Sequence, residues 1–309
     1  MKRAFLISPI LFASSLCFSF GAQGATTLPE SCLTSAAGLE TARHGALTLE
    51  NYAARLSADG SQLNVTDATL TDGRKILDNA ALNDANAFGA LGALVLLRGK
   101  TPAACDTDGS HAALRSIAKE IAHGAQPELV WHGAKLARSG HGYLAKTVHV
   151  RFASVSGKPD RIRITMDASG ISALDGTAAP QDASADIDLP LRALSDAASG
   201  ATNVPLVASG ETLTVNKVHA AYGQSSLDGH GYIQSGSSWR DSVSRMHLEI
   251  GHMADLLSAV RAHTSAGVTT ALAMAQFMAH RDGDKVSWDV GLNNGVVDVN
   301  NVPLPVTLP

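Results

Sequence analysis

The sequence predicts an α+β fold: a mainly antiparallel, twisted β-sheet that contains a degenerate repeat, with a C-terminal helical hairpin packed on it. From Glu128 onward, apolar residues recur at every second position, as in strands with one buried face. Turn signals such as residues 157–160 and 293–295 separate these alternating segments. Residues 253–279 change to helical spacing, which predicts helices that cover one face of the sheet.

The N-terminus has the features of a secretory signal peptide over residues 1–24. Lys2 and Arg3 precede an apolar stretch, and the small residues at 22–24 predict cleavage before Ala25. The apolar stretch is marginal in length for a membrane span, so a retained anchor is the alternative. No later stretch has the length and apolar character expected of a span, which predicts an exported protein without a transmembrane segment after processing.

Composition disfavours several classes of partner. The mature chain keeps about 285 residues, enough for a sizeable core. Removal of Lys2 and Arg3 changes the formal net charge from −4 to −6, so we do not expect a basic surface for nucleic acid. Aromatic residues make up 5% of the chain, which disfavours an aromatic-lined carbohydrate groove.

Two cysteines remain after processing, Cys32 and Cys105. Because two thiols in an oxidising compartment usually pair, we expect a Cys32–Cys105 disulfide; two separately buried thiols are the alternative. Closing a loop of roughly 74 residues would stabilise the fold by roughly 4 kcal/mol in the chain-entropy description. Neither cysteine lies in a Cys-x-x-Cys motif, so a redox role is not predicted.

Residues 25–125 form the first predicted region, an N-terminal α/β unit. Alternating leucine and valine predict strands between Ala46 and Asp72. Residues 80–98 are ambiguous, because the run suits a buried strand or a short buried helix and its glycines disfavour a long helix. A helix is predicted over residues 110–123, where leucine and isoleucine recur at helical spacing after cap-forming side chains.

Residues 126–309 form the second predicted region, which is rich in strands. Its first predicted strands cover residues 128–131, 141–155, 161–166 and 187–191. A polar loop is expected at residues 178–185. Pro190 predicts that the strand at 187–191 ends there or lies at a sheet edge, and one helical turn is expected within residues 193–200.

Residues 211–257 predict two long strands joined at Gly223, then a third strand and a helix. Within this stretch the sequence DGHGYI, at residues 228–233, matches SGHGYL at residues 139–144. Each motif precedes an alternating strand and a short apolar segment, so we interpret the two as a degenerate structural repeat. Because the motif occurs twice, its glycines are expected to allow close backbone approach rather than to form a catalytic loop.

The remaining C-terminal residues predict a helical hairpin and then a β-hairpin. Gly267 divides two apolar groups at helical spacing, one within residues 256–260 and one within residues 272–278. Residues 285–292 alternate as a strand before the Asn-Asn-Gly turn signal. The tail at residues 301–305 is too rich in proline for a central strand.

Residues 205–309 resemble a family of uncharacterised Gram-negative envelope proteins that is itself similar to the C-terminal region of AsmA-like proteins. The resemblance rests on a strand ending in Tyr-Gly (221–223), a Leu-x-Gly-x-Gly strand (227–231), a strand leading to a Leu-Leu helix (248–257), and a strand, turn and strand ending in Pro-Leu-Pro (292–305). It implies a curved antiparallel sheet with helices at one side. Some AsmA-like relatives are associated with phospholipid movement or envelope integrity, which implies a periplasmic role of that kind.

The preferred hypothesis is therefore a non-enzymatic envelope protein that holds an acyl chain between sheet and helices, with lipid or envelope proteins as partners. The residues predicted to line the ligand groove are Leu256, Leu257, Val260, Phe277, Met278 and Trp288. No Gly-x-Ser-x-Gly, phosphate-loop or dinucleotide motif occurs, so no catalytic residue or cofactor is predicted. The twelve histidines lack the spacing of a metal site, and no metal is predicted.

Two other functions stay open at this point. One is a periplasmic enzyme whose site is assembled from scattered polar residues, which a polar pocket with shifted titratable groups would indicate. The other is a scaffold that binds an envelope partner along an uncovered strand edge. For the helical hairpin, a closed core is the alternative to a groove, because apolar stripes at helical spacing usually pack.

Overall fold

One antiparallel sheet organises the protein. The computed structural model describes residues 26–196, 210–261 and 276–307, and over these ranges sixteen strands join in that sheet. The first eight are β1 (Leu33–Ala36), β2 (Leu39–Arg43), β3 (Ala46–Leu56), β4 (Gln62–Asp72), β5 (Pro127–Arg138), β6 (His141–Val155), β7 (Lys158–Ser169) and β8 (Ser172–Ala173). The others are β9 (Asp182–Pro190), β10 (Thr212–Tyr222), β11 (Ser225–Gln234), β12 (Val243–Gly251), β13 (His280–Asp282), β14 (Lys285–Asn293), β15 (Val296–Val299) and β16 (Val302–Thr307). The predicted mainly antiparallel α+β fold is confirmed.

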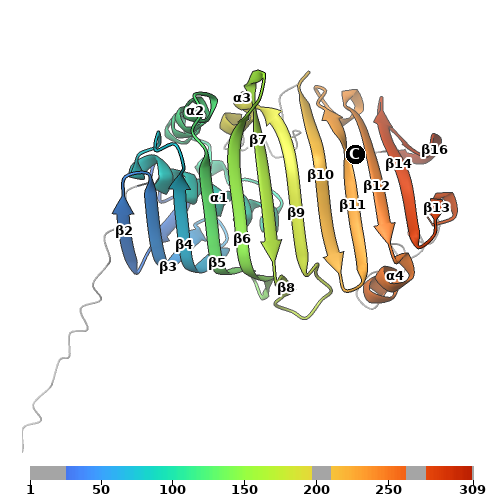
Figure 1. Ribbon diagram of the computed structural model, residues 1–309, viewed down its shortest axis with the longest axis horizontal. Coiled ribbons are helices and arrows are strands. Elements are labelled where there is room, and N and C mark those ends of the chain that lie inside the picture. The colour runs from blue at the N-terminus through green and yellow to red at the C-terminus, as the bar shows by residue number, and fades with distance from the viewer. Residues whose placement is uncertain (1–25, 197–209, 262–275, 308–309) are drawn as a thin grey trace, which may run out of the picture.

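The strands follow one another across the sheet in nearly the order of the sequence, as a long meander (Figure 1). Three short strands lie outside this order. β2 pairs with β3, as β1 does, β8 pairs with β6, and β13 pairs with β14. β4 pairs with β5, so strands from the predicted regions 25–125 and 126–309 lie side by side in one sheet.

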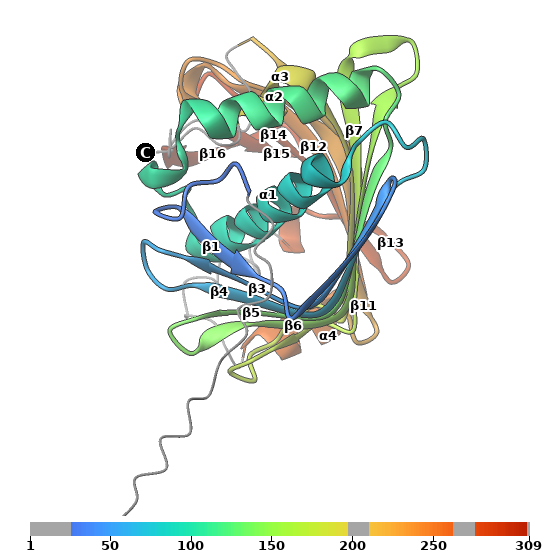
Figure 2. The same ribbon diagram turned by 90° about the vertical axis from the view of Figure 1, so that its left-hand side faces the viewer.

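Helices cover the concave side of the sheet. They are α1 (Asn79–Arg98), α2 (Asp108–Ala122), α3 (Leu191–Asp196) and α4 (Met253–Arg261), with 3-10 turns at Ala103–Cys105 and Trp239–Asp241. Figure 2 shows α1 and α2 inside the curve of the sheet. α1 packs on β3, β4 and β5, whereas α2 and α3 contact β7 and their side chains join a cluster with β9 and β10. Side chains of α4 join a third cluster with β12, β14 and β15.

Residues 79–98 form one helix of 20 residues, longer than the buried strand or short helix that the sequence favoured. Asp78 caps it, because its carboxylate accepts a hydrogen bond from a backbone N–H of the first turn at 2.8 Å, and Gly99 ends it with a φ of 86°. Gly89 faces the sheet, where a Cβ would lie 2.9 Å from Leu129 Cδ2. The missing side chain lets α1 lie close to β5, and this contact outweighs the low helix propensity of glycine.

The expectation that no stretch after the N-terminus is long and apolar enough to cross a membrane needs correction, because α1 is, by length and composition alone. Core helices of soluble proteins share this property. Here its inner residues, Leu82, Asn86, Ala87, Ala90, Leu91 and Leu94, are buried. Asn86 is fully buried, and its Oδ1 accepts a hydrogen bond from Trp131 Nε1 at 3.0 Å. α1 is therefore the central core helix of the N-terminal half.

The two-residue alternation is interrupted at one level of the N-terminal strands. Buried positions step by three residues, from Leu49 to Tyr52 in β3, from Val65 to Ala68 in β4 and from Trp131 to Ala134 in β5. The residues between them include Asn51 and Gly133, which have φ values of 51° and 62°. The pairing register is the same on both sides of this level, so the interruptions align in one row across β3, β4 and β5 without shifting the register.

Several local predictions are confirmed and two need correction. The terminal turn is a two-residue turn, in which Asn294 and Gly295 have φ values of 52° and 74°. The loop expected at 178–185 is shorter, because β9 already begins at Asp182. The predicted helical hairpin is not seen in the described residues: α4 is its first arm, but residues 262–275, which include the predicted turn, lie outside them.

The predicted disulfide between Cys32 and Cys105 is present, with both residues fully buried and an S–S distance of 2.08 Å. It joins the turn before β1 to the 3-10 turn between α1 and α2. The predicted signal peptide, residues 1–24, lies outside the described part of the chain.

Candidate functional site

The inner face of the sheet is apolar, but its two halves differ in burial. Under α1 many inward-facing side chains are exposed by 3% or less, among them Leu47, Leu63, Val65, Leu70 and Trp131. In the C-terminal half many of the corresponding side chains are only half-buried: Val218, Leu227, Met246, Leu248 and Val290. Among the described residues, the C-terminal half therefore presents apolar surface that is covered only in part.

Four of the six predicted groove residues come together next to this surface. Leu257 and Trp288 are buried in a cluster formed by α4, β12, β14 and β15, and Leu256 and Met278 pack against it half-buried. Phe277 is 87% exposed and is not part of the cluster. The side chain of Val260 lies outside the described residues. Leu257 and Trp288 are thus core residues at the end of the accessible apolar surface.

The outer face of the sheet is polar, and its side chains form rows across the strands. The pairing register of β6, β7, β9 and β10 places opposite one another His149, Asp167, Ser184 and His219. A second row, two residues along these strands, contains Thr147, Ser169 and Asp182. Alternation along each strand at this level separates these rows from the apolar face.

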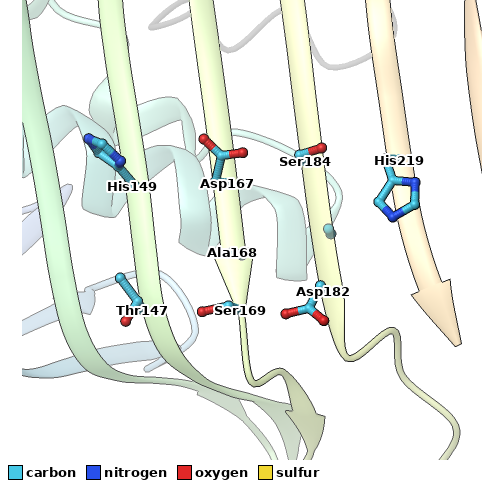
Figure 3. Close-up of a pocket in the computed structure, with 9 residues that line it drawn as sticks. Thr147, His149, Asp167, Ala168, Ser169, Asp182, Ser184 and His219 are labelled. Carbon is cyan, nitrogen blue, oxygen red and sulfur yellow. The ribbon is translucent and has the colours of Figure 1, made fainter. Parts of the chain in front are cut away.

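The two rows line an open hollow of about 410 Å³, shown in Figure 3. His149 and His219 lie at its two ends, with Asp167 and Ser184 between them. Each imidazole is held from outside the hollow by a carboxylate. His149 Nε2 hydrogen-bonds to Glu128, and His219 Nδ1 lies 2.8 Å from Asp228 Oδ1.

Ser184, His219 and Asp228 lie in one row across β9, β10 and β11, and these are the residue types of a serine hydrolase triad. The imidazole–carboxylate half of a triad is present, but in the described structure no hydrogen bond joins Ser184 to His219. The strands that carry them are paired on both sides, so their backbone N–H groups bind neighbouring strands and do not form an oxyanion hole. In the described structure this row therefore lacks two parts of a serine hydrolase site, the serine–histidine hydrogen bond and the oxyanion hole.

Other outer-face histidines also have carboxylate partners. His247 Nδ1 lies 2.8 Å from Asp289, and the ring centroid of His247 lies 5.2 Å from that of His230 on β11. Metal sites need three or four converging ligands. Over the described ranges no group of three or more His, Cys, Asp or Glu side chains is placed to hold a metal ion.

Acidic residues nearer the other end of β9 are structural. Arg163 donates a hydrogen bond to Asp188 at 2.8 Å and lies 3.3 Å from Asp186, and Asn216 at the bulge of β10 donates to both carboxylates. Burial by itself raises the pKa of Asp188, but the hydrogen bonds from Arg163 and Asn216 and the nearby positive charge outweigh it, so the pKa is lowered. These carboxylates are neutralised within the sheet and lie outside the hollow.

The hollow was not predicted from the sequence. The available signal was the polar half of each alternating strand, such as Asp167 and Ser169 between inward-facing residues of β7. That signal shows which residues share a face of one strand. It does not show that Asp167 lies opposite Ser184, because register depends on pairing between distant segments.

No protein-family model, curated protein or solved structure matches this chain. The arrangement of residues in the structure is therefore the basis for assigning a function.

Proposed function

We propose that the protein is a non-enzymatic, exported envelope protein that binds a lipid acyl chain against the inner face of the C-terminal half of its sheet. The observation that carries this proposal is the contrast between the two halves of one apolar face. Leu63 and Leu70 are sealed under α1, whereas Met246 and Leu248 are half-buried. Accessible apolar surface on a folded protein is typical of a binding site.

The chemistry of this surface supports a flexible hydrocarbon as the ligand. The half-buried residues Val218, Leu227, Leu248 and Val290 are aliphatic, and Met246 adds an adaptable thioether side chain. Charged residues of the same strands face the opposite side, so a bound acyl chain would not bury a charge. Each methylene removed from water would contribute about 0.8 kcal/mol.

The resemblance of residues 205–309 to envelope proteins that are themselves similar to the C-terminal region of AsmA-like proteins supports the same function by analogy only. The signal peptide expected over residues 1–24 would bring the protein to the periplasm, where lipids and envelope proteins are its expected partners.

The structure gives less support to the two alternatives. A scaffold that binds along a strand edge needs a long free edge. At one edge of the sheet, β1 and β2 have only four and five residues. At the other edge, β16 contains Pro303 and Pro305, which cannot donate backbone hydrogen bonds. An enzyme is disfavoured because the most triad-like row, around His219, lacks a serine hydrogen bond and an oxyanion hole within the described structure.

Binding of a fluorescent fatty acid to the purified mature protein tests the proposal. We expect saturable binding, weakened about tenfold or more by Met246→Asn or Leu248→Asn, because each places an amide on the apolar surface. Arg245→Asn is the matched control, since Arg245 is exposed on the same strand and faces the other side; this variant should bind normally. Absence of saturable binding, together with absence of lipid in mass spectra of solvent extracts, would reject the proposal.

Export is tested separately by the mass of the protein recovered from the cell envelope. Cleavage should leave a chain that begins near Ala25. A chain that retains Met1 in a soluble cytoplasmic fraction would contradict export, whereas a retained N-terminus in the membrane fraction would indicate the anchor.

A further inference from the structure

We propose that the hollow on the outer face binds a small, elongated organic cation with N–H donors at both ends, such as a linear polyamine. This hollow lies on the opposite face of the sheet from the proposed lipid surface, so the two proposals are independent. Three properties of the hollow support the binding of such a cation: its balance of hydrogen-bond acceptors and donors, its charge and its length.

The hollow is rich in hydrogen-bond acceptors. Asp228 engages Nδ1 of His219, and in the neutral form of the ring this leaves a lone pair on the other nitrogen, Nε2. In the same way Glu128 engages Nε2 of His149, and in the neutral form of that ring Nδ1 carries the lone pair. Asp167 contributes a carboxylate between the two imidazoles. A ligand that complements these groups must be a donor.

The charge of the hollow favours a cation. Asp167 and Asp182 both line it. Arg151 lies 3.7 Å from Asp167 and offsets part of that charge, but both side chains are more than half exposed, so the pair is weak. Asp182 makes no ion pair with any described residue. Hydroxyl groups such as that of Ser184 can also accept hydrogen bonds from an ammonium group.

The length of the hollow favours an elongated molecule over a metal ion. His149 and His219 are separated by three strand-to-strand steps, from β6 through β7 and β9 to β10. At about 4.8 Å for each step, their backbones lie roughly 14 Å apart. Two ligands at this separation cannot converge on one ion, but the ends of an extended polyamine can reach both.

Calorimetric titration with spermidine at low ionic strength and pH 7.5 tests the proposal. We expect one binding site, with affinity lowered about tenfold or more in Asp167→Asn and in Asp182→Asn, because each loses a hydrogen bond to a charged group. Asp160→Asn is the matched control, since Asp160 is exposed on β7, the strand that carries Asp167, and lies outside the hollow. This variant should bind as the unaltered protein does.

Two further measurements separate the site from general attraction to an acidic protein. His219→Ala removes a ring nitrogen that can accept a hydrogen bond but leaves both carboxylates of the hollow in place, and should weaken binding severalfold. n-Butylamine, which reaches only one end, should bind at least about tenfold more weakly than spermidine. Equal weakening by Asp160→Asn, unchanged affinity in both hollow variants, or no measurable binding of spermidine would each overturn the proposal.

Discussion

The carboxylate of Asp72 accepts a hydrogen bond from the backbone N–H of Gln126 at 2.9 Å, across 54 positions of the sequence. The backbone N–H groups of Arg74, Ile76 and Leu77 donate to the same carboxylate at 2.7–3.1 Å. Asp72 is 2% exposed and ends β4. One side chain therefore joins the connection from β4 to α1 with the connection from α2 to β5.

Asp72→Asn should lower the free energy of unfolding by about 3 kcal/mol, because an amide can accept at one oxygen only and its NH₂ group would face buried N–H donors. Urea denaturation measures this change. Asp160→Asn makes the same substitution at an exposed site and should change stability by less than about 0.5 kcal/mol. Similar small effects of both substitutions would contradict the assigned role of Asp72.

The same carboxylate should make stability depend on acidic pH. Burial alone raises the pKa of Asp72, but its four backbone donors outweigh burial and lower the pKa. The contribution of Asp72 is therefore fully present above the unfolded-state pKa of about 4 and is lost as pH falls through the lower folded-state value. The difference in unfolding free energy between the unaltered protein and Asp72→Asn should be constant from pH 7 to about 5 and shrink below about 4. A difference that stays constant to pH 2 would exclude this linkage.

Gly133→Ala should destabilise the protein through both backbone strain and a clash. Gly133 has a φ of 62°, and a Cβ there would lie 2.5 Å from Thr66 Oγ1. Gly157 has a φ of 74° with no atom near the Cβ position, so Gly157→Ala reports the strain alone, about 1–2 kcal/mol. We expect thermal unfolding to show a larger loss for Gly133→Ala, part of which Thr66→Ala restores. Equal losses of stability at the two glycines would mean that the backbone at Gly133 accommodates a side chain without a clash.

Asn86 and Trp131 should be energetically coupled. Trp131 Nε1 donates to Asn86 Oδ1, and Asn86 Nδ2 has no hydrogen-bond partner in the described structure. Trp131→Phe or Asn86→Leu alone leaves a buried polar atom unpaired and should cost about 1–3 kcal/mol beyond the change in packing. The double variant should cost less than the sum of the single changes. A double-mutant cycle in urea measures this difference, and strict additivity would show that the hydrogen bond contributes little.

Leu257 and Phe277, which were predicted to line one groove, should respond differently to truncation. Leu257 is 6% exposed within a packed cluster, so Leu257→Ala should cost about 2–5 kcal/mol. Phe277 is 87% exposed, and Phe277→Ala should change thermal stability by less than about 0.5 kcal/mol. A large loss at Phe277 would indicate that its ring is covered in solution.

The strands were largely predictable because their signals are local. Alternation along residues 141–155 and the Asn-Asn-Gly turn at residues 293–295 depend only on neighbours in the chain. The cysteine pairing also followed from the sequence, since the two cysteines that lie outside the expected signal peptide leave one intramolecular connection. The predicted groove was harder to define, because helical spacing identified apolar residues such as Phe277 without showing which of them the sheet covers.

Tertiary contacts decided the helix at residues 79–98, the carboxylate site of Asp72 and the outer-face hollow. Gly89 weakens a helix in isolation, yet it allows α1 to approach Leu129 closely. Periodicity in the sequence assigns a residue to one face of its own strand. Which residue lies beside it on the next strand depends on the pairing register, as when Ser184 lies beside Asp167. Register is set by the pairing of segments that are far apart in the chain.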